Sequence, residues 1–257
     1  MITTEQIKEL RDATSVSVMQ CKKALEETGG DMEKALMVLK KKSVEMASKK
    51  SDREVKAGLI ALKSDNKKAV AAVLQCETDF VAKNQDFVDL TNKIAQIAFE
   101  NGKDKAEADA GELINNVIQK VGENIKIKEI SIIEGENLGI YTHSGKLASI
   151  VSLKGGTPEL AKDVAMQVAA MNPEFMSMTD IDDQTKENVR QLFVKEVEET
   201  NKPEEIKKKI LDGKVASYFN ERVLTEQAFI KDPNVSIGKL LANAGDAKII
   251  KAVRISI

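Results

Sequence analysis

Residues 78–84 read T-D-F-V-A-K-N, and a related segment, T-P-E-L-A-K-D, follows at residues 157–163. Both fit the pattern T-x-x-[V/L]-A-K-[N/D], at an offset of 79 residues, and each comes where an expected strand passes into an expected helix. Residues 128–132 and 251–255 also correspond, at an offset of 123 residues, as the closing strands of two copies. Internal duplication of one α+β unit explains both offsets, with an insertion of 44 residues (123 − 79) in the second copy.

Each copy is expected to combine a β-hairpin, helices and a closing strand in an α+β subdomain with an antiparallel sheet. Residues 58–63 and 68–76 are rich in β-forming residues and flank a turn at 64–67. One long amphipathic helix is expected to follow from about residue 80, then a helix at 112–121 and a strand at 125–133. In the second copy, strands near 138–141 and 146–153 flank a turn at 142–145. The sequence therefore predicts core subdomain 1 at residues 57–136 and core subdomain 2 at residues 137–178 and 224–257.

Three further segments lie outside these subdomains. Residues 1–40 contain three short amphipathic helices, ended or capped by signals such as Gly29-Gly30-Asp31, and are expected to form a separate small module. Residues 41–56 are lysine-rich and read as a solvated linker, diluted by acidic residues. Residues 179–223 are helical and heavily charged, with a break at 201–203, which predicts an inserted antiparallel helical hairpin.

Composition excludes several classes of function. The 257 residues carry 39 Lys and Arg against 41 Asp and Glu, so the net charge of −2 argues against a general nucleic-acid binder. No apolar run approaches the roughly 18–20 residues that a bilayer requires. The N-terminus has neither a signal-peptide nor a transit-peptide plan. A cytoplasmic protein without a membrane partner is expected.

Few side chains are suited to enzyme chemistry. There is one histidine, His143, and the two cysteines, Cys21 and Cys76, lack any metal-ligand or redox spacing. No glycine-rich phosphate-binding loop occurs. We therefore expect no catalytic residue, metal site, cofactor or small-molecule substrate.

The residues that break the repeat are the strongest candidates for function. Where the second copy has Pro158 and Glu159, both ordinary in a first helical turn, the first copy has Asp79 and Phe80. Phe80 is either a core residue or an exposed aromatic suited to wedging into a partner, and the pattern leaves both open. His143 lies in or beside a hairpin turn, where a plain turn residue is the simpler interpretation and a partner contact is the other.

Several segments resemble the bacterial elongation factor Ts family. They are M-Q-C-K-K-A-L at 19–25, C-E-T-D-F-V-A-K-N at 76–84, G-E-N-I at 122–125, the Gly29–Asp31 turn, Tyr141–His143, and V-S-I-G-K-L-L at 235–241. The similarity covers essentially the whole chain in order, and the T-D-F-V-A-[K/R]-N segment is highly specific. The resemblance implies nucleotide exchange factors for elongation factor Tu, which are not enzymes and need no cofactor. It also implies an N-terminal module like ubiquitin-associated domains, two related subdomains and a helical-hairpin insert.

The resemblance further implies which residues meet the GTPase. Thr78, Asp79, Phe80 and Val81 correspond to the segment that disturbs its Mg²⁺ and phosphate site. Val18, Met19 and Lys22 would contact the GTP-binding domain, with His143 nearby, and Ile237, Gly238 and Leu240 would face its third domain. A C-terminal helical extension that some relatives carry after the last strand is not expected here.

A second class of function stays open at this stage. The lysine-rich stretch at residues 40–56 and the helical arm could serve a non-catalytic adaptor that associates with RNA or the ribosome. The balanced charge argues against direct nucleic-acid binding, and exchange on elongation factor Tu is the favoured prediction.

Overall fold

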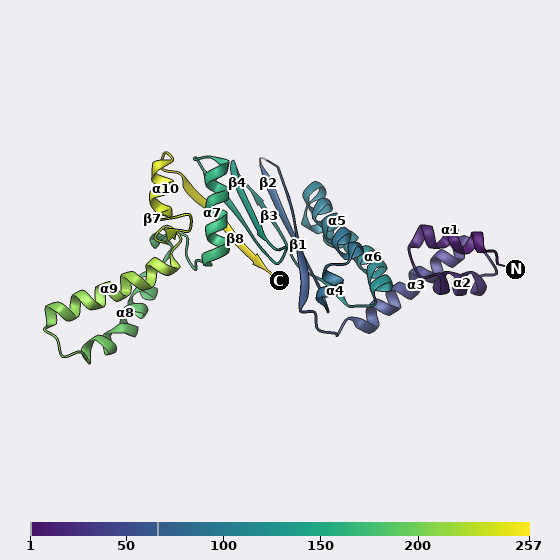
Figure 1. Cartoon of the computed structure of the whole chain (residues 1–257), viewed down its shortest axis with the longest axis horizontal. Coiled ribbons are helices and arrows are strands. Elements are labelled where there is room, and N and C mark those ends of the chain that lie inside the picture. The colour runs from purple at the N-terminus through teal and green to yellow at the C-terminus, as the bar shows by residue number, and fades with distance from the viewer. Residues whose placement is uncertain (1, 66) are drawn as a thin grey trace. The chain divides into compact units, whose positions relative to one another are not determined.

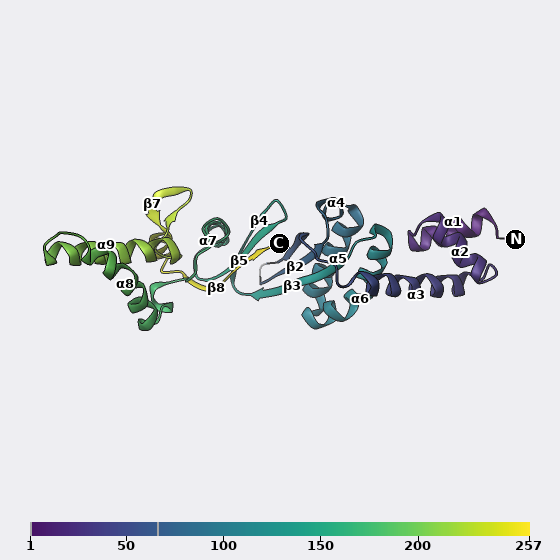
Figure 2. The same ribbon diagram turned by 90° about the horizontal axis from the view of Figure 1, so that it is seen from below.

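The computed structural model describes residues 2–65 and 67–257 (Figures 1 and 2). It combines helices with antiparallel sheets, which confirms the expected α+β class. The chain divides into two compact units, formed mainly by residues 2–64 and 70–132 and mainly by residues 133–256. Within the described residues, no helix has the combined length and apolar character that crossing a bilayer would demand.

The first unit begins with a three-helix module. It consists of α1 (Thr4–Thr14), α2 (Val18–Glu27) and α3 (Met32–Lys50). The side chains of Thr3, Ser17 and Asp31 each accept a hydrogen bond from a backbone N–H at the start of the following helix. The helices enclose a small core of their own, made by Leu10, Val16, Cys21, Ala24, Leu25, Ala35 and Leu39.

The segment expected as a linker is largely helical. Residues 41–50 form the C-terminal half of α3, in which Ser43 is buried and Met46 and Ala47 pack against the main core of the unit. Lys42 pairs with Glu27 at 2.8 Å and Lys56 with Glu54 at 3.0 Å, and Lys40, just before the segment, pairs with Glu112 at 2.7 Å. Ion pairs with carboxylates and apolar packing on one side hold this stretch in place. The high lysine content of the sequence does not indicate this packing.

The main body of the first unit is a three-stranded sheet with helices packed against it (Figure 1). The strands are β1 (Ala57–Ser64), β2 (Lys68–Cys76) and β3 (Ile125–Glu134), in the order β1-β2-β3. The helices are α4 (Asp79–Ala82), α5 (Gln85–Asn101) and α6 (Lys103–Val121). The turn at residues 64–67 includes residue 66, which lies outside the described residues.

Two helix predictions in this unit were wrong. The expected single helix after residue 78 is two helices, because Asn84 takes an extended conformation and its side chain accepts a hydrogen bond from the Asp86 N–H at 2.9 Å, starting α5 anew. The helix expected at 112–121 begins nine residues earlier, at Lys103. Its first half buries only the small side chains of Ala106 and Ala110, which leave a weak apolar pattern.

The second unit repeats the arrangement of the first. Strands β4 (Asn137–His143), β5 (Leu147–Lys154) and β8 (Lys248–Ser256) form an antiparallel sheet in the order β4-β5-β8, and α7 (Pro158–Met171) lies along it (Figure 1). A Cβ on Gly139 would stand 2.0 Å from the Ala161 carbonyl, so glycine lets α7 approach β4 this closely.

The insertion forms two antiparallel helices (Figure 2). They are α8 (Asp183–Glu198) and α9 (Glu204–Arg222), preceded by a 3₁₀ turn, η1 (Met178–Asp180). A short hairpin of β6 (Ala228–Phe229) and β7 (Asp232–Ser236) then leads into α10 (Ile237–Asn243). The base of the helical hairpin has its own apolar cluster, formed by Ile181, Val189, Phe219 and Val223 with Phe175 packed against it.

Candidate functional site

The segment Thr78–Val81 forms the first turn of α4. Thr78 is the N-cap, and its hydroxyl accepts a hydrogen bond from the Val81 N–H at 3.4 Å. Val81 and Ala82 are buried in the core of the first unit, whereas Thr78 and Asp79 are exposed. The segment is therefore anchored on its C-terminal side by apolar packing, while its N-terminal side faces solvent.

Phe80 is 89% exposed, so its side chain is not part of the core. Successive residues on a helix are separated by about 100°, so a residue just before the buried pair Val81–Ala82 points to the open side. An exposed aromatic ring at the start of a helix contributes nothing to the protein's own core. Burial of such a side chain on a partner would contribute about 1.5–3 kcal/mol.

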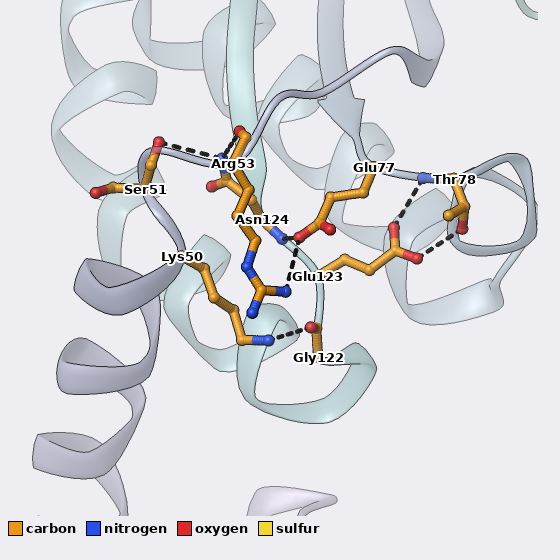
Figure 3. Close-up of polar contacts among 8 residues, drawn as sticks. All are labelled: Lys50, Ser51, Arg53, Glu77, Thr78, Gly122, Glu123 and Asn124. Atoms are coloured by element: carbon orange, nitrogen blue, oxygen red, sulfur yellow. Dashed lines mark hydrogen bonds and ion pairs between the residues drawn. The ribbon is translucent and has the colours of Figure 1, made fainter.

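Glu123 holds the start of this segment from across the unit (Figure 3). One carboxylate oxygen accepts the Thr78 N–H at 2.9 Å, and the other accepts the Thr78 hydroxyl at 2.6 Å. Glu123 follows Gly122, whose φ of 78° turns the chain between α6 and β3. Both donors of Thr78 thus end on one side chain 45 residues away in the sequence.

The neighbouring residues extend this contact to the end of α3 (Figure 3). The Glu77 carboxylate accepts the Asn124 N–H at 2.7 Å and lies 3.5 Å from the Arg53 guanidinium. The buried Asn124 amide donates to the Ser51 and Arg53 carbonyls at 3.3 and 2.8 Å. The Lys50 ammonium donates to the Gly122 carbonyl. The strand end before Thr78, the turn before β3 and the end of α3 are therefore joined.

Cys76 contacts the backbone of the site at Thr78. Its thiol is buried and donates to the Thr78 carbonyl at 3.3 Å. Burial raises the pKa of the Cys76 thiol to about 12, and the negative charge of Glu123 adds to this effect. The group stays a neutral thiol at physiological pH and supports the backbone at Thr78.

The residues expected to bind from the N-terminal module lie at the start of α2. Met19 is 77% exposed, and Val18 and Lys22 are also exposed, with the Lys22 ammonium 3.8 Å from the Glu26 carboxylate. They are exposed, whereas Cys21, Ala24 and Leu25 of the same helix are buried in the core of the module. These three side chains are free of the module's own core.

His143 ends β4 and is exposed, next to the hairpin turn in which Ser144 and Gly145 have positive φ angles. Its ring is stacked on that of Tyr141 at a centroid distance of 6.5 Å, and its Nδ1 lies 3.4 Å from the Tyr141 hydroxyl. The position beside the turn is as the pattern indicated. An exposed ring in this place is accessible to a partner.

The residues of the third expected group, on α10, differ in how deeply they are buried. Ile237 is completely buried in the core of the second unit, so in this conformation its side chain cannot touch a partner. Leu240 is half-buried, and the Gly238 N–H donates to the Thr225 carbonyl at 2.8 Å. The family resemblance placed Ile237 among the contact residues, but at the start of α10, just after the Ser236 cap, its side chain is directed inward.

The expected residues are divided between the two compact units. Thr78–Val81 and the α2 residues belong to the first unit, and His143, Ile237, Gly238 and Leu240 to the second. In residues 2–65 and 67–257, no group of three or more His, Cys, Asp or Glu side chains is placed to hold a metal ion. The sequence pattern does not single out Arg53, Glu77 or Asn124 as residues that hold the backbone near Thr78. It gives Glu123 no role beyond its place in the G-E-N-I segment.

The comparisons with known proteins all give the same family. The family described as elongation factor TS matches residues 77–257. A protein of Psychromonas ingrahamii named elongation factor Ts is 42% identical over all of this chain and 90% of its own length. Proteins of the same name from Hahella chejuensis and a Hydrogenobaculum species are 38% and 37% identical, over 98% and 92% of this chain and 91% and 92% of their own lengths.

Proposed function

Because the chain belongs to the elongation factor Ts family, we propose that it releases GDP from elongation factor Tu by pressing Thr78–Val81 against the Mg²⁺ and phosphate site of that GTPase. The protein is a nucleotide exchange factor of translation, and the role of an RNA-associated adaptor is not favoured. The observation that carries the mechanism is Phe80, an exposed aromatic ring on a helix start that is held from both sides.

The energetics of exchange follow from linkage. A GTPase that binds GDP with a nanomolar Kd holds it by about 12 kcal/mol. A factor that binds the empty GTPase more tightly than the loaded one weakens nucleotide binding by the same factor, because the coupling is reciprocal. Shifting a partner from 1:99 to 99:1 takes about 5.5 kcal/mol of differential affinity. Disturbing a bound Mg²⁺ and the phosphate-binding backbone is an effective way to reach it, since these groups supply much of the charge complementarity.

The segment is well equipped for this task. A ring that is already exposed loses no internal contacts when it enters a partner surface, and a fixed backbone loses little conformational entropy. Asp79, beside it at the helix start, carries a carboxylate that competes with phosphate oxygens for cations and backbone N–H groups.

Other parts of the chain would supply affinity. We assign Val18, Met19 and Lys22 of the three-helix module, which we take to be similar to ubiquitin-associated domains, to the GTP-binding domain of elongation factor Tu. His143, Gly238 and Leu240 would meet other surfaces of the same partner. The factor would act in the cytoplasm, without a cofactor, a small-molecule substrate, a membrane or direct contact with nucleic acid. Pairing of Lys40 and Lys42 with carboxylates reduces the charge available for RNA.

The test exchanges residues between the two copies of the repeat. The double substitution Asp79→Pro with Phe80→Glu installs the residues of the second copy, which start a helix equally well. Release of labelled GDP from elongation factor Tu should be accelerated by the unchanged protein and not by this variant, while both melt at similar temperatures. A stable variant that still released GDP at the full rate would overturn the mechanism.

A further inference from the structure

The bidentate contact between Glu123 and Thr78 is absent from the other copy of the repeat. Gly122 corresponds to Gly245 at the offset of 123 residues, and both have a φ of 78°, so Asp246 stands where Glu123 does. Within the described residues, no hydrogen bond joins Asp246 to Thr157, the matching N-cap. The pKa of the Glu159 carboxyl, two residues along the chain, is lowered first by its own backbone N–H and then by the Thr157 hydroxyl.

A helix start of this kind therefore forms without help from the turn before the closing strand. Thr157 caps α7 by accepting the Leu160 N–H at 3.2 Å. The extra contact to Glu123 appears only in the copy that carries Phe80. Capping does not require it, so another purpose must account for it.

The geometry indicates that purpose. Phe80 lies between two fixed points: Thr78, whose N–H and hydroxyl both end on Glu123, and Val81, which is buried in the core. With both ends held, the backbone of Asp79 and Phe80 cannot rotate to lay the ring against the protein's own surface. Orientation before binding raises the fraction of encounters in which a group reaches its target.

We infer that Glu123 is a positioning residue of the exchange reaction: through Thr78 it holds Phe80 in the direction that disturbs the nucleotide site of the partner. The inference rests on the proposed function of Thr78–Val81. It assigns no partner contact to Glu123, which is half-buried and occupied by Thr78.

The experiment measures GDP release from elongation factor Tu against the concentration of the factor. For Glu123→Ala, the rate at saturation should fall about tenfold, because a displaced reacting group commonly costs at least that much. The half-saturating concentration should change less than about threefold, because other surfaces supply most of the affinity. Glu123→Gln should recover most of the rate, since its amide oxygen can accept the Thr78 N–H while its amide nitrogen donates to the Thr78 hydroxyl.

Two further variants make the test specific. Asp246→Asn changes the matching carboxylate of the second copy, at a positive φ that asparagine tolerates, and should leave exchange unchanged. In a Phe80→Ala background, Glu123→Ala should cause no additional loss, because a positioning residue acts through the residue it positions.

Three outcomes would overturn the inference: full exchange by Glu123→Ala, a Glu123→Gln variant as slow as Glu123→Ala, or a full additional loss in the Phe80→Ala background. The Phe80→Ala single variant separates this failure from that of the proposed function. If Phe80→Ala is slow but Glu123→Ala is not, only the positioning role fails. If Phe80→Ala exchanges at the full rate, the mechanism itself fails.

Discussion

Thr78 and Thr157 begin α4 and α7 in almost the same backbone conformation, with φ and ψ of −129° and 155° at Thr78 and −126° and 160° at Thr157. Each hydroxyl accepts the N–H of the third residue along, Val81 or Leu160. After this shared start the copies diverge, because α4 ends at Ala82 whereas α7 continues to Met171. The same helix start thus carries Pro158 and Glu159 in one copy and Asp79 and the exposed Phe80 in the other.

Exposure of Phe80 predicts that Phe80→Ala affects exchange and not stability. The free energy of unfolding should change by no more than about 0.5 kcal/mol, as is usual for surface substitutions. Phe87 is the matched control, because it is completely buried in the same unit and its truncation should cost about 3–5 kcal/mol. Denaturant titration of both variants checks the prediction. A Phe80→Ala variant destabilised as much as Phe87→Ala would show that the ring belongs to the core.

Burial of Asn124 predicts a local loosening when its side chain is removed. Asn124→Ala leaves the Ser51 and Arg53 carbonyls without their amide donor, at a cost of about 1–3 kcal/mol. Hydrogen–deuterium exchange at residues 51–56 should then become faster. Asn116→Ala, at an exposed position on α6, serves as control and should leave the hydrogen–deuterium exchange of residues 51–56 unchanged. Equal protection in both variants would mean that this contact does not hold the end of α3.

The different burial of Ile237 and Leu240 on α10 predicts different effects when each side chain is truncated. Ile237→Ala should destabilise the second unit by about 2–5 kcal/mol, because its side chain is fully buried. Leu240→Ala removes a half-buried side chain and should cost less, while weakening binding to elongation factor Tu if the proposed contact exists. Thermal melts and binding titrations of both variants separate the two effects. Normal stability together with lost binding for Ile237→Ala would restore it as a contact residue.

The raised pKa of Cys76 predicts a pH dependence with a defined sign. Its folded pKa of about 12 lies above the ordinary value of 9.0, so folding disfavours the thiolate. The contribution of this group to stability is therefore complete below pH 9 and is lost as the pH rises from 9 toward 12. Cys76→Ala should show a smaller loss of stability over this range than the unchanged protein. The same burial should protect Cys76 from alkylation at pH 8 until the protein unfolds.

The apolar cluster at the base of the hairpin sets a limit on how much of the arm can be removed. Replacing residues 194–214 by a short Gly/Asn turn should preserve the cooperative melt, because Phe219, Val223 and Phe175 stay together. Replacing the whole of 179–223 should lower the melting temperature. The buried Val223 side chain is then lost, together with the hydrogen bonds that the N–H groups of residues 174 and 175 donate to the Arg222 carbonyl. Equal melting temperatures for the two deletions would contradict this assignment.

The sequence by itself determined what depends on neighbouring residues. The passages from strand to helix near residues 78 and 157, the turn at 142–145 and the hairpin insert follow from patterns within a few positions, because helix starts and strand alternation are local properties. The duplication follows from comparing segments 79 and 123 residues apart in the same sequence. The difference between Asp79-Phe80 and Pro158-Glu159 makes the first copy the candidate for function, since two copies of one unit are expected to differ where their tasks differ.

Only the tertiary structure decided which side chains are buried and which residues distant in sequence meet. The exposure of Phe80 depends on which side of α4 packs into the core, where Val81 and Ala82 lie, and the burial of Ile237 depends on the core that α10 covers. The hold of Glu123 on Thr78 spans 45 residues. No local pattern encodes such a contact, because it exists only once α6 and β3 have packed beside the end of β2 and brought a turn to a helix start.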